Sequence, residues 1–202
     1  LKGTSFAIES VGHVGQAFAD QLRSRISPES FCSFNAACIE NASCHNGTPA
    51  QPAKSAVALM QWIQGAFIYT CTGGLLADTV STSQIPYFLS ANHCISQQKN
   101  ANNLETYFQF SIACGSTNCP PQTQPGGQQR LGATIKATGT GGDFTLFQLN
   151  QTPPAGSVFL GWNNTPVANT NNAPLYRISH PAWAPQAYSD QTVSTSAPTC
   201  TG

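Results

Sequence analysis

The sequence predicts an all-β protein built from antiparallel strands, and three observations support this fold class. After residue 55 the chain consists of short apolar runs separated by turn residues. It contains 17 glycines and 14 prolines, which suits a chain with many turns. Only one helix is expected, over 16–26, beginning after Gly15 and ending before Ser27-Pro28. Many short strands with few helices are typical of a β-barrel or a β-sandwich.

Eight apolar runs are the expected strands. They are Val57–Ile63, Ala66–Leu76, Ile85–Ser90, Thr106–Ile112, Ala133–Ala137, Phe144–Leu149, Val158–Trp162 and Leu175–Ile178. Residues typical of turns mark the breaks, among them Gly73-Gly74, Gly126-Gly127, Gly141-Gly142, Pro153-Pro154 and Asn163-Asn164. No internal repeat of fixed period is present.

The charge composition excludes some partners. Charged residues make up 8% of the chain, against about 25% in an average globular protein. Eight basic and eight acidic side chains cancel, so no general field attracts nucleic acid or an anionic membrane surface. The most apolar stretch, 56–69, is interrupted by Gln61, Gln64 and Gly65 and is not expected to span a bilayer. We therefore expect neither a nucleic-acid nor a membrane partner.

Eight cysteines indicate the compartment. They stand at 32, 38, 44, 71, 94, 114, 119 and 200, and an even number in a chain of low charge favours disulfides, which persist in oxidising compartments. The alternative is reduced or metal-bound thiols, but no C-x-x-C occurs and Cys44-His45 alone does not make a zinc site. The chain begins at Leu1 without a signal-peptide pattern, as expected of a processed product. The expectation is a secreted, extracellular protein with no cofactor or metal.

His93 is the candidate general base among four histidines. It ends the apolar segment Tyr87-Phe-Leu-Ser-Ala-Asn and is followed directly by Cys94. A Cys71–Cys94 disulfide would join two strands and fix the position of the imidazole, which proton transfer requires. A lone histidine is more often structural, but the neighbouring cysteine favours a functional role.

Asp143 is the candidate partner of His93. A carboxylate would orient the imidazole and stabilise its charged form. Asp143 follows Gly141-Gly142 and opens the alternating strand Phe144–Leu149, where a charge is unfavourable unless it is paired. The alternative is an aspartate that caps a hairpin turn. The other acidic residues lie in polar segments or in predicted turns.

These residues carry a resemblance to a known family. Cys71-Thr-Gly-Gly-Leu with Tyr87–Cys94, and Gly142-Asp143-Phe-Thr-Leu-Phe-Gln-Leu149, resemble the histidine loop and the aspartate strand of trypsin-like serine peptidases of the bacterial lysyl-endopeptidase branch. The pair Cys32-x5-Cys38 and the segments Phe159–Asn163 and Ile178–Pro181 resemble that branch more weakly. The resemblance implies that His93 is the general base, that Asp143 orients it, and that His180 is a structural or surface residue.

The resemblance also implies an architecture of two antiparallel β-barrels of the trypsin-like type. We expect an N-terminal extension over 1–30 and a complete first barrel over 31–150. Residues 151–202 would form a linker and the first strands of a second barrel that is only partly present. The Gly-x-Ser-Gly loop that carries the nucleophile in such peptidases is missing. We therefore expect a second polypeptide to supply the serine and the remaining strands.

The disulfide pairing implied by the resemblance joins Cys38 with Cys114, which leaves Cys44 for Cys119. Cys32 and Cys200 would then both bond to the second polypeptide or, alternatively, to each other.

The expected function is therefore a secreted serine endopeptidase that hydrolyses peptide bonds of peptide or protein substrates by acyl transfer. This chain would supply His93 and Asp143 of the triad. The alternative is a secreted, non-catalytic, peptidase-like binding protein that lacks the nucleophile. A third class, a carbohydrate-binding sandwich, would need exposed aromatic residues on one face, and the three tryptophans are scattered.

Overall fold

A computed structural model describes residues 39–48, 50–80, 82–116, 118–120 and 125–196. This part of the protein is mostly β, as the sequence predicts. The helix expected over 16–26 lies outside the described residues, and the expected boundaries after residues 30 and 150 remain predictions. No helix within these ranges is long and apolar enough to cross a membrane.

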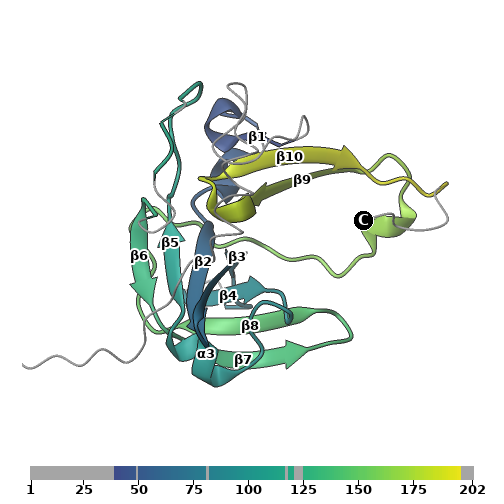
Figure 1. Cartoon of the computed structure of the whole chain (residues 1–202). Coiled ribbons are helices and arrows are strands. Elements are labelled where there is room, and N and C mark those ends of the chain that lie inside the picture. Colours follow the sequence, from purple (N-terminus) through teal and green to yellow (C-terminus); the bar gives the residue numbers. More distant parts are fainter. Residues whose placement is uncertain (1–38, 49, 81, 117, 121–124, 197–202) are drawn as a thin grey trace, which may run out of the picture.

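The described residues form ten strands in two antiparallel sheets (Figure 1). The larger sheet has the order β6-β5-β2-β3-β4-β8-β7, and the smaller has the order β1-β10-β9. The strands are β1 (Glu40–Asn41), β2 (Val57–Gln64), β3 (Phe67–Leu76), β4 (Tyr87–Ser90), β5 (Glu105–Phe108), β6 (Gln128–Leu131), β7 (Ala133–Gly139), β8 (Phe144–Leu149), β9 (Pro174–Ser179) and β10 (Ala187–Thr192). The helices are short: η1 (Ala42–Cys44), α2 (Ala50–Ala53), α3 (Gln98–Asn102), η2 (Val167–Asn169) and η3 (Pro181–Trp183).

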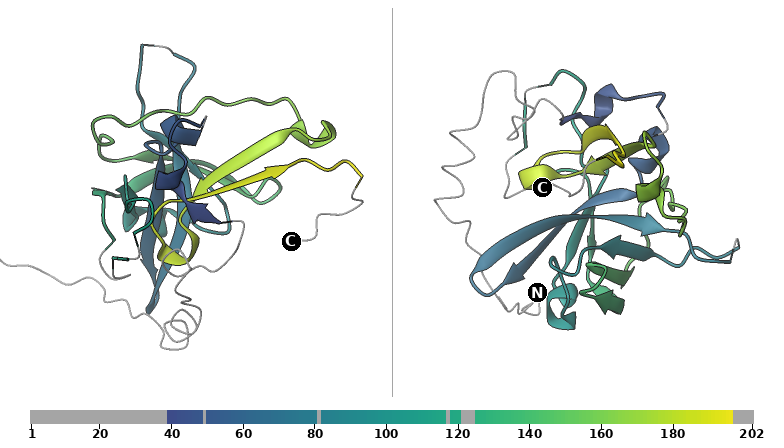
Figure 2. Two further views of the ribbon diagram at one scale, coloured as in Figure 1. Left: turned by 90° about the horizontal axis from the view of Figure 1, so that it is seen from above. Right: turned by 90° about the vertical axis from the view of Figure 1, so that its right-hand side faces the viewer.

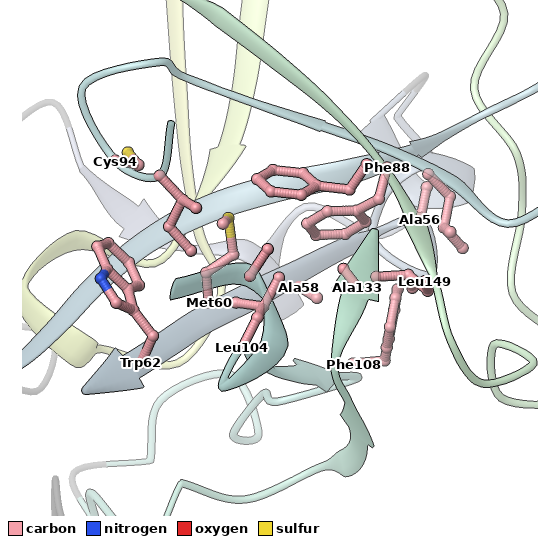
Figure 3. Packing of buried hydrophobic residues seen from close by; sticks show 14 residues of the cluster. Ala56, Ala58, Met60, Trp62, Phe88, Cys94, Leu104, Phe108, Ala133 and Leu149 are labelled. Carbon is pink, nitrogen blue, oxygen red and sulfur yellow. The ribbon is translucent and has the colours of Figure 1, made fainter. Parts of the chain in front are cut away.

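Strand β2 organises the core because both of its faces are buried. Ala58, Met60 and Trp62 point into the concave side of the curled seven-stranded sheet, where Phe88 and Phe108 pack in an edge-to-face arrangement (Figure 3). The intervening residues face the opposite side, toward two smaller clusters. A strand buried on both faces has a continuous apolar sequence rather than an alternating one.

The smaller sheet packs on the larger one through only part of its length. Ile178 of β9 lies in a cluster with Val57 of β2 and Ala42, Ala50 and Ala53. The remainder of the β9–β10 hairpin extends away from the body of the molecule (Figure 1, and the left view of Figure 2). Strand β1 joins this sheet by pairing with β10, with Glu40 opposite Tyr188.

Among the described residues, seven strands form a curled antiparallel sheet, which agrees in part with the expected first barrel. Its outermost strands, β6 and β7, are separated in sequence only by Gly132, whose N–H donates to Leu104 O at 2.7 Å and whose carbonyl oxygen accepts from the Asn150 N–H at 3.0 Å. The smaller sheet differs from the expectation, because its edge strand β1 comes from residues before the larger sheet. The all-β class is confirmed, and the completeness of the first barrel stays a prediction.

Two of the expected strands are shorter in the structure than the sequence predicts. The strand expected over Val158–Trp162 is reduced to a single parallel bridge between Leu160 and Leu76. Strand β5 ends at Phe108, because Gln109 adopts a left-handed conformation with φ of 57°, which interrupts extended backbone.

Gly73 and Gly74, expected at a turn, lie inside β3 and face opposite ways. A Cβ on Gly73 would overlap the ring of Phe88, which is fully buried, and would lie 2.9 Å from the carbonyl oxygen of Leu89. A Cβ on Gly74 would make only ordinary van der Waals contacts, with Leu160 Cδ1 at 3.5 Å and with Ala56 O and Val57 Cγ2 at 3.9 Å. The first glycine therefore makes room for the core, and the second does not.

Gly73→Ala should lower the free energy of unfolding by about 1–3 kcal/mol, the usual effect of overpacking. Gly74→Ala is the matched control, and we expect it to be close to neutral. Urea denaturation of both variants measures the difference. Equal stability of the two variants would show that the packing of the Phe88 ring does not require a glycine at position 73.

Candidate functional site

His93 lies in the turn that follows β4, and a disulfide fixes this turn to β3. Cys94 is bonded to Cys71, with Cα atoms 6.3 Å apart. The backbone N–H of Cys94 donates to the carbonyl oxygen of Ala91 at 3.3 Å, which closes the turn around the histidine. The clamp that the sequence predicts is therefore present.

Asp143 lies in the turn between β7 and β8. Its backbone N–H donates to Thr140 O at 3.2 Å, and its φ of 44° is left-handed. This conformation is uncommon outside glycine, although aspartate and asparagine tolerate it best. A residue held in a sparsely populated conformation often marks a functional position.

The two side chains meet across the ends of β4 and β8. His93 Nδ1 lies 2.6 Å from Asp143 Oδ2, and the backbone N–H of His93 donates to Asp143 Oδ1 at 3.0 Å. Both oxygens of the Asp143 carboxylate therefore form hydrogen bonds with His93. The side chains are largely open to solvent, with exposed fractions of 70% for His93 and 53% for Asp143.

The hydrogen bonds from His93 also stabilise the charge of Asp143. The N–H of the His93 backbone, followed by its ring, lowers the pKa of the Asp143 carboxyl below its ordinary value. With the carboxylate accepting from Nδ1–H, the neutral imidazole carries its lone pair on Nε2. The pair has the arrangement in which histidine can accept a proton from a hydroxyl group.

No nucleophile accompanies the pair within the described part of the chain. There, no serine or threonine hydroxyl forms a hydrogen bond with the His93 ring. Three cavities formed by described residues, lined in part by Trp62, Tyr176 and Asp78, include neither His93 nor Asp143 in their linings. The catalytic roles of His93 and Asp143 therefore remain predictions.

A cluster of possible metal ligands at this site does not form a metal centre. Ligand atoms of Cys71, His93 and Cys94 lie within 4.8 Å of one another. Both sulfurs are part of the disulfide, and metals bind cysteine as the thiolate.

The disulfide pairing implied by the resemblance is wrong. Cys44 is bonded to Cys114, with Cα atoms 4.8 Å apart, which excludes both Cys38–Cys114 and Cys44–Cys119. The Asn41 amide explains this pairing, because it donates to Ile112 O at 3.3 Å and Ala113 O at 3.0 Å and so holds η1 beside residue 114. Cys119 also takes part in a disulfide. Cys32, Cys38 and Cys200 lie outside the described residues.

His180 is structural and buried, with an exposed fraction of 3%. Its ring stacks on Phe110, with centroids 5.7 Å apart, and its Nδ1–H donates to Ala184 O at 2.9 Å. Its Nε2 is buried without a hydrogen-bond partner among the described residues. Burial lowers its pKa to about 4.

The fold and the site together define a mostly-β protein with internal disulfides that carries a histidine–aspartate pair. The chain belongs to the family of the lysyl endopeptidase C-terminal domain, whose family model matches residues 31–202. It is 32% identical over 189 residues to the lysyl endopeptidase of Pseudomonas aeruginosa strain PAO1. That match covers 88% of this chain and 38% of the relative, so the chain spans well under half of that protein's length.

The family match corrects the resemblance described above. Residues 31–202 match a C-terminal domain, so their assignment to the opening barrel of a trypsin-like peptidase that stops before its serine is wrong. The resemblance rested on short segments around His93 and Asp143. Such segments report local geometry and do not identify the part of a larger protein to which they belong.

Proposed function

We propose that this chain is a secreted, peptidase-related domain that binds a polypeptide partner and does not hydrolyse peptide bonds by itself. One observation carries the proposal: His93 and Asp143 are paired at 2.6 Å, yet the pair faces solvent without a hydroxyl nucleophile from the described residues. Hydrolysis by acyl transfer needs that nucleophile within hydrogen-bond reach of the base.

Two further features support a binding domain that works outside the cell. The Cys44–Cys114 and Cys71–Cys94 disulfides suit an oxidising compartment. In the smaller sheet, β9 has a strand neighbour on one side only among the described residues. An edge strand of this kind can add an extended polypeptide by main-chain hydrogen bonding.

A second candidate function is the base half of a composite hydrolytic site, and the double contact between His93 and Asp143 favours it. A partner polypeptide would supply a serine. His93 Nε2 would take the hydroxyl proton as the serine oxygen attacks the substrate carbonyl, and would return that proton to the leaving amine. Asp143 would hold the required tautomer throughout.

Three assays of the purified 202-residue chain separate these functions. The first uses a fluorogenic peptide amide and a serine-directed phosphonylating reagent, and we expect neither turnover nor labelling. The second uses p-nitrophenyl acetate, whose activated ester needs little assistance. The third measures the fluorescence anisotropy of labelled β-casein as an extended polypeptide, and we expect saturable binding.

His93→Gln is the matched variant for all three assays. If the pair acts as a base, ester hydrolysis in the parent should exceed that of His93→Gln by about tenfold or more; equal rates would reject the second candidate. Binding of casein should be the same in both proteins, and its absence would contradict the binding function. Amide turnover that disappears in His93→Gln would overturn the proposal and reveal a complete site.

A further inference from the structure

A chain of three hydrogen bonds connects the two flanks of His93 to the hairpin that carries Asp143. Asn92 Nδ2 donates to Thr138 Oγ1 at 2.7 Å. Thr138 Oγ1 lies 2.7 Å from Thr145 Oγ1, and Thr145 Oγ1 donates to the carbonyl oxygen of Ile95 at 2.7 Å. The chain therefore begins one residue before His93 and ends two residues after it.

The direction of the chain follows from its last member. Thr145 uses its only hydroxyl proton for the Ile95 carbonyl, so in its 2.7 Å contact with Thr138 it is the acceptor. The Thr138 hydroxyl also lies 3.2 Å from the carbonyl oxygen of Phe144, a longer alternative acceptor within the same hairpin. Thr138 in turn accepts from the Asn92 amide. Each hydroxyl is both donor and acceptor, and such chains strengthen their members mutually.

The two threonines place this hydrogen-bond chain next to Asp143. Thr138 and Thr145 stand directly opposite each other in the β7–β8 ladder, and Asp143 lies two residues before Thr145. Thr145 is fully buried, which shields its bond to Ile95 from water. The same rung of the hairpin therefore holds the His93 turn from both flanks while the adjacent turn presents Asp143.

We propose that Thr138 and Thr145 are positioning residues that set the register of His93 relative to Asp143. The Cys71–Cys94 disulfide fixes the turn to β3, but it places no constraint on the distance from His93 to β8. The β4–β8 ladder, in which Ser90 lies opposite Thr145, brings the start of the turn beside β8, and the two hydroxyls hold the turn to the hairpin on both sides of His93 itself. The assignment concerns the geometry of the pair, and only its consequence for proton transfer depends on the base function proposed above.

The tautomer of His93 is the appropriate measurement, because the Asp143 carboxylate favours the Nδ1–H form only while the pair is in register. Long-range ¹H–¹⁵N spectra of the full chain give the ratio of the Nδ1–H to the Nε2–H form. Thr145→Val keeps the shape of the side chain and removes the hydroxyl. We expect it to lower that ratio by about tenfold, as the loss of one hydrogen bond would.

Three further variants make the test specific. Thr138→Val should act in the same direction, and Thr145→Ser, which retains the hydroxyl, should restore the ratio. Thr106→Val is the matched control, since Thr106 is another buried threonine whose hydroxyl donates to a backbone carbonyl, that of Arg130 at 3.4 Å. It should affect stability without changing the His93 tautomer.

The pKa of Asp143 provides a second readout in the same samples. The hydrogen bonds from His93 hold this pKa low, so Thr145→Val should raise it toward its ordinary value. An unchanged tautomer ratio and Asp143 pKa in folded Thr145→Val would overturn the positioning role. An equal change of the tautomer ratio and of the Asp143 pKa in Thr106→Val would also overturn the positioning role, because both quantities would then depend only on the stability of the protein. If the geometry responds as expected but ester hydrolysis does not, the base function fails and the positioning role stands.

Discussion

Removal of the Cys44–Cys114 disulfide should lower the free energy of unfolding by about 4 kcal/mol, and removal of Cys71–Cys94 by about 3 kcal/mol. The two bridges close loops with sequence separations of 70 and 23 residues. A cross-link restricts the unfolded chain, and the restriction grows with the logarithm of the loop length. Urea denaturation of the paired Cys→Ala variants measures both losses.

The effects of the same two variants on the His93–Asp143 pair should have the opposite order. Cys94 is adjacent to His93, whereas Cys44 ends η1 and is bonded to Cys114. Cys71→Ala/Cys94→Ala should therefore shift the His93 tautomer, and Cys44→Ala/Cys114→Ala should leave it unchanged. If the His93 tautomer ratio instead changes in proportion to the loss of unfolding free energy in both variants, the disulfide at His93 has no specific role.

Acidification from pH 7 to pH 4 should destabilise the folded protein by about 3 kcal/mol through His180 alone. Burial lowers the pKa of this ring from 6.5 to about 4, and one pKa unit corresponds to about 1.4 kcal/mol. Below pH 6.5 the unfolded chain binds a proton that the folded protein does not bind until about pH 4. The contribution is therefore complete above pH 6.5 and is lost as the pH falls to about 4.

The structural reason is the environment of the ring. Its Nδ1–H already donates to Ala184, so a second proton must go to Nε2, which is buried without an acceptor among the described residues. Two carboxyls, Asp78 and Asp143, also have lowered pKa values, but their ordinary value is 3.8. Their contributions are therefore lost below about pH 4, outside the window of His180.

Chemical denaturation at pH 7.0, 5.5 and 4.5 of the parent and His180→Gln tests this prediction. The glutamine can still donate to Ala184 and does not titrate, so the variant should lose much of the pH dependence. His45→Gln, which removes the histidine that contacts Glu40 at the surface, should retain it. Equal slopes for the parent and His180→Gln would contradict the assignment.

Local sequence identified the site because its constraints are local. Cys94 beside His93, and Asp143 at the start of an alternating strand, both report short-range geometry, and the structure places these residues together. The threonines that bracket His93 could not be identified in the same way. Thr138 and Thr145 resemble ordinary strand residues until the register of β7 and β8 is known.

The errors in the fold have a common physical origin in tertiary contacts. Strand β10 has the polar sequence Ala-Tyr-Ser-Asp-Gln-Thr, which shows no apolar run because much of the hairpin lies beyond the core. Gly73-Gly74 has the composition of a turn, but Gly73 lies within a strand because the Phe88 ring needs the space. In both cases a neighbour distant in sequence decides the conformation.

The uneven packing of the smaller sheet divides the molecule into regions of different local stability. Strands β2 and β3 each have hydrogen-bonded neighbours on both sides, whereas β9 has only one among the described strands. Backbone amides at the open end of the β9–β10 hairpin, where Pro174 pairs with Thr192, should therefore exchange with deuterium through local opening, while those of β3 require opening of the central sheet. Because Cys71 belongs to β3, the scaffold behind His93 belongs to the slowest-exchanging unit, and fraying of the open end of the hairpin leaves it intact.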